Sequence, residues 1–227
     1  NSFLTCKIAF INEMADLCEV IGADINKVST GMGLDKRIGS DFLKAGPGFG
    51  GSCFPKDILA LQYLTTQIKS DFLVLDAVIK ANSNRVRLIV EKIKKFLGGN
   101  ICGKKITVLG LTYKAGTDDL RSSPAIELIN LLWENGVEVK AYDPQGMPNA
   151  YKYFGNRLVC CPSVFEAASG ADAIIIATEW PEFVESDYAK LLPKLNSPNI
   201  IDLRSILDKK TLNNLGYKCY FVGQKIS

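Results

Sequence analysis

The sequence contains no histidine among its 227 residues. Histidine supplies the base in Ser-His and Cys-His catalysis, so its absence excludes both mechanisms and leaves proton transfer to carboxylate, lysine or cysteine side chains. The chain also lacks a signal-peptide pattern and any apolar run long enough to span a membrane, so no membrane partner is expected. The net charge is only +3 and there is no basic stripe, so no nucleic-acid partner is expected either.

The cysteines form no recognisable framework. There are seven, an odd number at irregular spacing, which argues against a set of disulfides. No CxxC pair is present, so no zinc site and no other metal is predicted. These features favour the reducing environment of the cytoplasm. Cys160 and Cys161 are adjacent within an apolar run, and we interpret them as strand residues that pack in a core.

What is present is enough hydrophobic material, 47% of the residues, for a sizeable core and for two domains. Residues 1–98 are predicted to form a helical domain around one loop, because apolar residues recur at helical spacing and glycines interrupt the pattern. The predicted helices span residues 3–22, 24–32, 54–64 and 71–97. The last one is long and amphipathic, and two interpretations of its apolar face stay open: burial within its own subunit, or a dimer seam.

Residues 99–227 alternate between strand and helix patterns, which predicts the doubly wound α/β class with an open parallel sheet. Such sheets bind ligands beyond the carboxyl ends of their strands. Asp143 follows the second predicted strand, where a dinucleotide-binding fold places an acid for the ribose. The first turn, from Gly110 to Gly116, lacks GxGxxG, so close approach of a pyrophosphate is not predicted there. The predicted strands are 106–109, 137–142, 173–178, 200–202 and 217–222, with helices over 124–135, 164–168 and 188–192.

The most informative segment is a glycine-rich loop that ends at Cys53. Glycines stand at positions 46, 48, 50 and 51, and the residues from Phe54 to Leu64 have helical apolar spacing, with a proline suited to the first turn. A helix N-terminus and the neighbouring Lys56 both favour the thiolate, which is the nucleophilic form of cysteine. On these residues alone, an ordinary turn followed by a buried, inert cysteine is the more frequent situation.

The run from Gly48 to Asp57 reads GFGGSCFPKD and resembles the nucleophile loop of the UDP-glucose 6-dehydrogenase family, whose signature is GFGGSCFxKD. The resemblance implies an NAD-dependent oxidation of UDP-glucose to UDP-glucuronate. In this chemistry Cys53 attacks the C6 aldehyde to give a thiohemiacetal, and a thioester formed from it is hydrolysed. The resemblance further implies that Asp57 positions or activates the water and that Lys56 lies near the cofactor.

Other stretches extend the resemblance. GxxxK followed by Asp-Asp-x-Arg-x-Ser is similar to a second family motif, which implies that Lys114 contacts the substrate and that Arg121 reaches the NAD. Asn1 resembles an asparagine that binds the substrate and helps to hold the oxyanion of the reacting carbon. Arg37 resembles an arginine that reaches the neighbouring subunit's site, and Arg204 falls near another family contact. The implied substrate loop consists of Phe42, Leu43, Lys44, Ala45 and Gly46, and Gly50 is expected to lie against the hexose.

Members of this family are about twice as long as this chain and begin with a βαβ domain that carries GxGxxG and the main NAD site. The resemblance therefore covers the central and C-terminal portions, as residues 1–98 and 99–227, and the chain by itself is not expected to complete the oxidation. It also implies a homodimer through the long central helices. Two alternatives stay open: a non-catalytic remnant that dimerises or binds UDP, and a dehydrogenase for GDP-mannose or for a UDP-N-acetylhexosamine.

Overall fold

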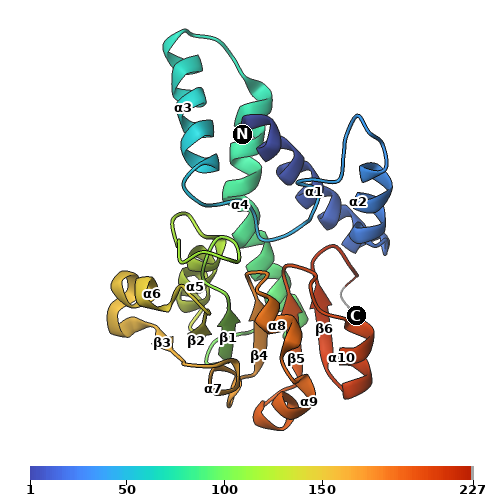
Figure 1. The fold of residues 1–227 in the computed structure, drawn as a ribbon, viewed down its shortest axis with the longest axis vertical. Coiled ribbons are helices and arrows are strands. Elements are labelled where there is room, and N and C mark those ends of the chain that lie inside the picture. The colour runs from blue at the N-terminus through green and yellow to red at the C-terminus, as the bar shows by residue number, and fades with distance from the viewer. Residues whose placement is uncertain (226–227) are drawn as a thin grey trace.

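The computed structural model describes residues 1–225 and begins with a helical part (Figure 1). The predicted helices are confirmed, with small shifts at their ends. Gly22 ends the first helix in a left-handed conformation with φ 77°, which glycine adopts without strain. Asp24 caps the second helix by accepting a hydrogen bond from the Asn26 amide. The four helices are α1 (Ser2–Ile21), α2 (Ile25–Gly33), α3 (Phe54–Gln67) and α4 (Leu73–Phe96).

The second part is a six-stranded sheet in the order β3-β2-β1-β4-β5-β6, and every pairing in it is parallel. The predicted doubly wound class is thus confirmed, and the order reverses between β1 and β4, where such sheets bind ligands. The strands are β1 (Lys105–Leu109), β2 (Glu138–Tyr142), β3 (Val159–Cys160), β4 (Ala173–Ile176), β5 (Asn199–Asp202) and β6 (Lys218–Phe221).

Helices connect the strands, as parallel pairing requires. Those within the predicted ranges are α5 (Pro124–Glu134), α7 (Val164–Ala168) and α9 (Tyr188–Leu191). Several short elements were not predicted, because segments of this length carry too little periodicity to be recognised. They are α6 (Met147–Phe154), α8 (Pro181–Glu185), α10 (Lys209–Leu215) and the 3-10 turns η1 (Gly155–Arg157) and η2 (Leu192–Lys194). Cys160, interpreted from the sequence as a strand residue, lies in β3, and Cys161 follows it in a core cluster.

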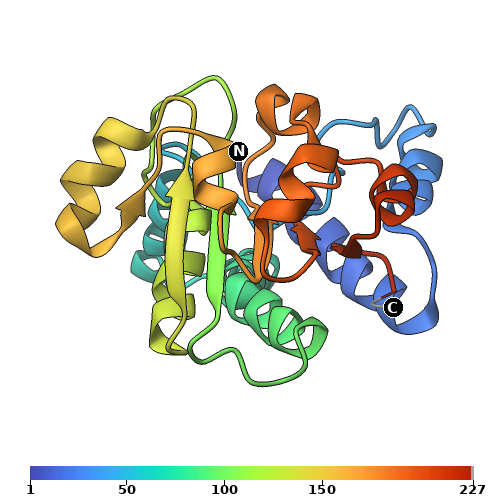
Figure 2. The same ribbon diagram turned by 90° about the horizontal axis from the view of Figure 1, so that it is seen from below.

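The two faces of the sheet are covered by different helices (Figure 2). Along β4, Ala173 and Ile175 belong to a core cluster with α1, α4 and α5, whereas Ile174 and Ile176 belong to a second cluster on the other face. The second cluster contains residues of α7, α8, α9 and α10. Because α1 and α4 pack directly on the sheet, the glycine-rich loop in the segment between them lies near the carboxyl ends of the strands. The division of the chain at residues 98 and 99 stays a prediction.

The long helix α4 buries its apolar face within its own subunit, which is one of the two interpretations left open by the sequence. Ile89 and Ile93 are completely buried and share a core cluster with residues of the sheet. The exposed apolar side chains of the helical part lie mainly elsewhere, on α1, α3 and the turn that precedes α4. None of the helices in residues 1–225 combines the length and apolar character that a membrane crossing needs.

Candidate active site

Cys53 stands at the N-cap position of α3, with Pro55 in the first turn of that helix. The Asp57 amide donates a hydrogen bond of 2.9 Å to the Cys53 carbonyl, which begins the helix at the predicted place. The thiol side chain is exposed. A residue at this position lies close to the unpaired N–H groups of the first helical turn, which carry a partial positive charge.

The glycine-rich loop packs against the segment that follows β1, so the two stretches that resemble family motifs meet in space. The Gly51 amide donates a 2.9 Å hydrogen bond to the Arg121 carbonyl. A Cβ atom on Gly50 would lie 2.1 Å from the Ser122 carbonyl oxygen, and one on Gly51 would lie 2.8 Å from the ring of Tyr113. These two glycines are therefore required by close packing between the loop and the sheet domain.

A cavity of about 640 Å³ lies between this loop and the carboxyl edge of the sheet. Its walls include Tyr113 and Lys114, which follow β1, Glu179, which follows β4, and Arg204, which follows β5. The cavity thus occupies the place where the strand order reverses, as expected for a ligand site of a doubly wound sheet. Six residues predicted to form the site line it: Cys53, Phe42, Lys44, Gly46, Gly50 and Lys114.

Other residues of the predicted substrate loop face the protein interior. Leu43 is buried in the main core, and Ala45 packs against the same cluster. The backbone of Gly46 is already hydrogen-bonded within the protein, because its amide donates to Asn12 Oδ1 at 2.8 Å and its carbonyl accepts from Arg85 Nε at 3.0 Å. The loop therefore offers a ligand mainly the side chains of Phe42 and Lys44, both exposed.

A polar group forms at the first turn of α3, where Lys56 and Asp57 meet Asn1. The Asn1 side-chain amide donates to Asp57 Oδ2, and Lys56 Nζ lies 3.2 Å from Asp57 Oδ1. The hydrogen bond from Asn1, followed by that from Lys56, lowers the pKa of the Asp57 carboxyl. The structure thus brings Asn1 together with the first turn of α3, the two places that were predicted to carry catalytic groups besides the thiol.

Arg204 is largely buried at the base of the cavity, with 17% of its side chain exposed. Its Nε donates to the Ala177 carbonyl at 2.8 Å and lies 3.2 Å from Glu179 Oε2, and its Nη2 donates to the Tyr113 carbonyl at 3.3 Å. Burial lowers the pKa of this guanidinium. These contacts fix a planar cation beside Gly46, in a geometry suited to a phosphate or a sugar hydroxyl.

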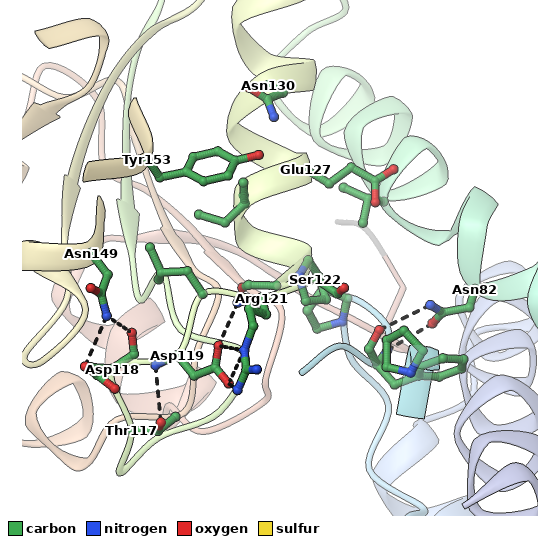
Figure 3. A pocket seen from close by; sticks show the side chains of 18 of the residues that line it. Asn82, Thr117, Asp118, Asp119, Arg121, Ser122, Glu127, Asn130, Asn149 and Tyr153 are labelled. Carbon is green, nitrogen blue, oxygen red and sulfur yellow. Dashed lines mark hydrogen bonds and ion pairs between the residues drawn. The ribbon is translucent and has the colours of Figure 1, made fainter. Parts of the chain in front are cut away.

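A larger cavity, of about 1000 Å³, lies on the other side of the glycine-rich loop, between α4, α5 and α6 (Figure 3). Arg121 lines this cavity and forms a two-pronged ion pair with Asp119, with its Nη2 at 2.7 Å and its Nε at 3.0 Å from the carboxylate oxygens. This pairing raises the pKa of Arg121 and lowers that of Asp119. Arg121 and Lys114 therefore line different cavities, separated by the loop.

Arg37 lies apart from both cavities. Its side chain is 90% exposed and pairs with Asp35 at 2.6 Å. Within one subunit it reaches neither Cys53 nor Lys114, and its predicted role in a neighbouring subunit's site stays a prediction.

Asp143 stands where a dinucleotide-binding fold places an acid for the ribose, but here it does not have that role. Its side chain is completely buried and its oxygens accept six hydrogen bonds from the protein. The carboxylate joins the turn after β1 to the turn after β2, and it has no free oxygen for a ribose. The donors are the amides of Leu111, Thr112, Gln145 and Gly146, the Thr112 hydroxyl and the Trp180 indole.

Sequence reasoning missed Glu179 as a site residue and matched Arg204 only loosely. Both lie within three residues of the end of a buried strand, and the rule that parallel sheets bind ligands at the carboxyl ends of their strands would have indicated them. Asn12, Asn82 and Arg85, which hold the glycine-rich loop, gave no such signal, because each is an isolated polar residue in a helical pattern.

The chain matches two models of one protein family. The central domain of the UDP-glucose/GDP-mannose dehydrogenase family matches residues 1–84, and its UDP binding domain matches residues 107–209. A UDP-glucose 6-dehydrogenase of Rickettsia bellii is 54% identical over 227 residues, which are 100% of this chain and 52% of that protein. The chain spans about half the length of the curated relatives it matches.

Solved structures agree with this grouping. A UDP-glucose dehydrogenase from Pyrobaculum islandicum superimposes with a TM-score of 0.88 at 34% identity, covering 99% of this chain and 49% of that one. A UDP-D-ManNAc dehydrogenase from Pyrococcus horikoshii gives a TM-score of 0.83 at 27% identity, covering 100% of this chain and 50% of that one. The chain belongs to the UDP-glucose/GDP-mannose dehydrogenase family, of which it spans the central and UDP-binding domains.

Proposed function

We propose that this chain is the thiol-bearing and UDP-sugar-binding half of an NAD-dependent UDP-glucose 6-dehydrogenase. The observation that carries the proposal is the cavity at the switch point of the sheet, with Cys53 in one wall and Lys114 and Arg204 in the other. Cations at the sheet edge suit a diphosphate, and an exposed thiol at a helix N-terminus suits covalent catalysis. The relatives named UDP-glucose 6-dehydrogenase support UDP-glucose as the substrate.

In this mechanism the Cys53 thiolate forms a bond to C6 of the sugar aldehyde, and the carbonyl electrons move to oxygen, giving a thiohemiacetal. The hydride acceptor would be NAD, when bound: one molecule would oxidise the C6 alcohol to this aldehyde, and a second would take the hydride from C6 of the thiohemiacetal. Loss of that hydride leaves a thioester, and water then adds to its carbonyl carbon and releases the uronate and the thiolate. Because its lowered pKa makes Asp57 a weak base, we assign it to orienting this water. We assign Asn1 to holding the oxyanion.

The residues of this sheet do not fit a dinucleotide at the usual place. Asp143 is saturated by protein donors, and a Cβ atom on Gly110 would lie 2.4 Å from Thr178 Cβ, so the first turn is packed against its neighbour. We therefore place the main NAD site in the half of the relatives that this chain does not span. Arg121 and Lys56, whose side chains are 70% and 74% exposed, are proposed to contact the cofactor from this half. A cytoplasmic location belongs to the same proposal.

Calorimetry with UDP-glucose tests the substrate site. We expect the 227-residue chain to bind UDP-glucose and UDP more tightly than GDP-mannose. Lys114→Ala should weaken binding about tenfold, the effect of one charge-assisted hydrogen bond. Lys218→Ala is the matched control, since this exposed lysine begins β6 at the opposite edge of the sheet and should not change the affinity. Equal binding by Lys114→Ala and the unaltered chain would contradict the assignment, and preference for GDP-mannose would favour the alternative substrate.

We also propose a homodimer, formed through α1. Phe3, Phe10 and Leu17 are spaced seven residues apart, on one side of this helix, and are 75%, 51% and 49% exposed. An exposed apolar stripe of this kind is typical of a helix that pairs with a second copy. In sedimentation analysis the chain should be a dimer, and a Phe10→Glu, Leu17→Glu variant should be a monomer. Val184→Glu, at an exposed apolar position on α8, should remain dimeric. A double variant that still dimerises would exclude this seam.

The non-catalytic alternative, a remnant that only dimerises or binds UDP, shares the cavity and the α1 stripe. Unlike the catalytic proposal, this alternative does not require the Cys53 loop to hold a fixed conformation. The packing of the Cys53 loop against Arg121 and Ser122 favours the catalytic interpretation, because an inert loop has no need of glycines at such close contacts.

A further inference from the structure

The glycine-rich loop is held from the helical side by side chains that no predicted role includes. Asn82 on α4 binds both backbone groups of Phe49: its Oδ1 accepts from the Phe49 amide at 2.9 Å, and its Nδ2 donates to the Phe49 carbonyl at 3.2 Å. The two dashed lines that leave Asn82 in Figure 3 mark this pair of bonds. Two opposed hydrogen bonds to one residue fix the orientation of its peptide groups.

Arg85, one turn further along α4, holds the same loop at Gly46. Its Nε donates to the Gly46 carbonyl at 3.0 Å, and its Nη1 lies 2.6 Å from Asp16 Oδ1. The side chain is only 3% exposed, and a guanidinium buried to this extent is costly unless it is paired and hydrogen-bonded. The position of Arg85 is therefore tightly determined by its surroundings.

The pairing continues beyond Arg85 into the sheet domain. Asp16 also pairs with Lys92, and Lys92 Nζ lies 2.7 Å from Glu19 Oε2. Glu19 Oε1 in turn accepts hydrogen bonds from the Gly223 amide at 2.8 Å and from the Tyr220 hydroxyl. The support of the loop thus extends from α4 through α1 to β6 and the turn after it.

Glycines make this support necessary. Gly48, Gly50 and Gly51 lie between Gly46 and the thiol, and glycine has more backbone freedom than any other residue. A Cβ atom on Gly48 would lie 2.8 Å from Asn82 Oδ1, so the glycine itself leaves room for the Asn82 amide. On the opposite side, the loop is bound at Gly51 by the Arg121 carbonyl.

We propose that Asn82 and Arg85 are positioning residues, which hold the Cys53 loop against α4 and thereby set the place of the thiol relative to Lys114 and Arg204. Neither residue lines the thiol cavity, so they act through the loop backbone. The inference rests on the proposed function, because it assigns the held thiol to UDP-sugar oxidation. Without the hydrogen bonds from Asn82 and Arg85, the segment from Gly46 to Ser52 would sample many conformations, and the thiol would lose its place at the N-terminus of α3.

The test uses Asn82→Ala and Arg85→Lys in the full 227-residue chain, with Asn84→Ala as the control at an exposed neighbouring position on α4. Arg85→Lys keeps a positive charge beside Asp16 and removes the guanidinium that reaches Gly46. Three quantities are measured: hydrogen exchange of the Phe49 amide by NMR, the rate of Cys53 alkylation by iodoacetamide relative to the exposed Cys102, and the affinity for UDP-glucose. Cys102 lies before β1, so the ratio cancels effects of global unfolding.

Asn82→Ala should speed exchange of the Phe49 amide by about fivefold or more, and both variants should lower the alkylation ratio and the UDP-glucose affinity by about threefold or more. Asn84→Ala should change none of them. Unchanged Phe49 exchange in folded Asn82→Ala would overturn the proposal, as would faster exchange with an unchanged ratio and affinity. If Asn82→Ala does not fold, the alkylation ratio and the UDP-glucose affinity of Arg85→Lys decide whether the proposal holds. Failure of the unaltered chain to bind UDP-glucose would instead contradict the proposed function. Exchange of the Phe49 amide and the Cys53 alkylation ratio would then still test whether Asn82 and Arg85 hold the loop.

Discussion

Gly50→Ala should weaken UDP-glucose binding at least tenfold and destabilise the chain by about 3 kcal/mol, the upper range for an overpacked core position. The added Cβ atom would lie 2.1 Å from the Ser122 carbonyl oxygen and 3.1 Å from Pro124 Cδ. The obstacle on the Ser122 side is backbone rather than a flexible side chain. Ser122 itself has φ 49°, an unusual left-handed conformation that leaves little room for adjustment.

The loop also cannot move away from Ser122 without losing a hydrogen bond. Moving Gly50 away from Ser122 would stretch the 2.9 Å hydrogen bond between the Gly51 amide and the Arg121 carbonyl, two residues before the thiol. We therefore expect at least a tenfold loss of UDP-glucose affinity by calorimetry together with a lower midpoint in thermal unfolding.

Gly31→Ala is the matched control for this prediction. Gly31 lies within α2, and a Cβ atom there would meet nothing within 4 Å. Alanine should stabilise this helix by about 0.5–1 kcal/mol and leave UDP-glucose binding unchanged. A Gly50→Ala chain with normal stability and normal affinity would show that the loop does not pack on Ser122.

Asp143→Ala should destabilise the chain by about 4 kcal/mol, because several buried donors would lose their only charged acceptor at once. Asp143 Oδ2 accepts from the Leu111 amide at 2.7 Å and from the Trp180 indole at 3.1 Å, and Oδ1 accepts from the Gly146 amide at 2.6 Å. No water can replace the carboxylate easily, since the side chain is completely buried.

Chemical denaturation of Asp143→Ala and Asp118→Ala distinguishes this structural role from the ribose-binding role that an acid at this position has in a dinucleotide-binding fold. Asp118 is exposed and accepts one side-chain hydrogen bond from Asn149 at 3.1 Å, so its loss should cost less than about 1 kcal/mol. A stable Asp143→Ala chain whose only defect was in binding a nucleotide would restore the ribose interpretation.

Local sequence patterns were sufficient for the elements with strong periodicity or clear end signals. The helix that begins after Cys53, the glycine stop at Gly22 and the alternation after Gly98 each depend on residues close together in the chain, and the structure confirms them. Short elements such as η1 and α8 were missed, because three to five residues do not show a period.

By itself, the sequence determined the family, the thiol loop and the doubly wound class, because each depends on the order of neighbouring residues. Only the tertiary structure decided which side chains surround the thiol and which apolar helix faces stay exposed. Arg204 and Glu179 reach the cavity because β4 and β5 end beside β1, and the apolar face of α4 is buried because it packs on the sheet. Asp143 likewise became a structural acceptor because two turns distant in sequence meet around it. Such contacts join residues far apart in the chain, and local periodicity carries no record of them.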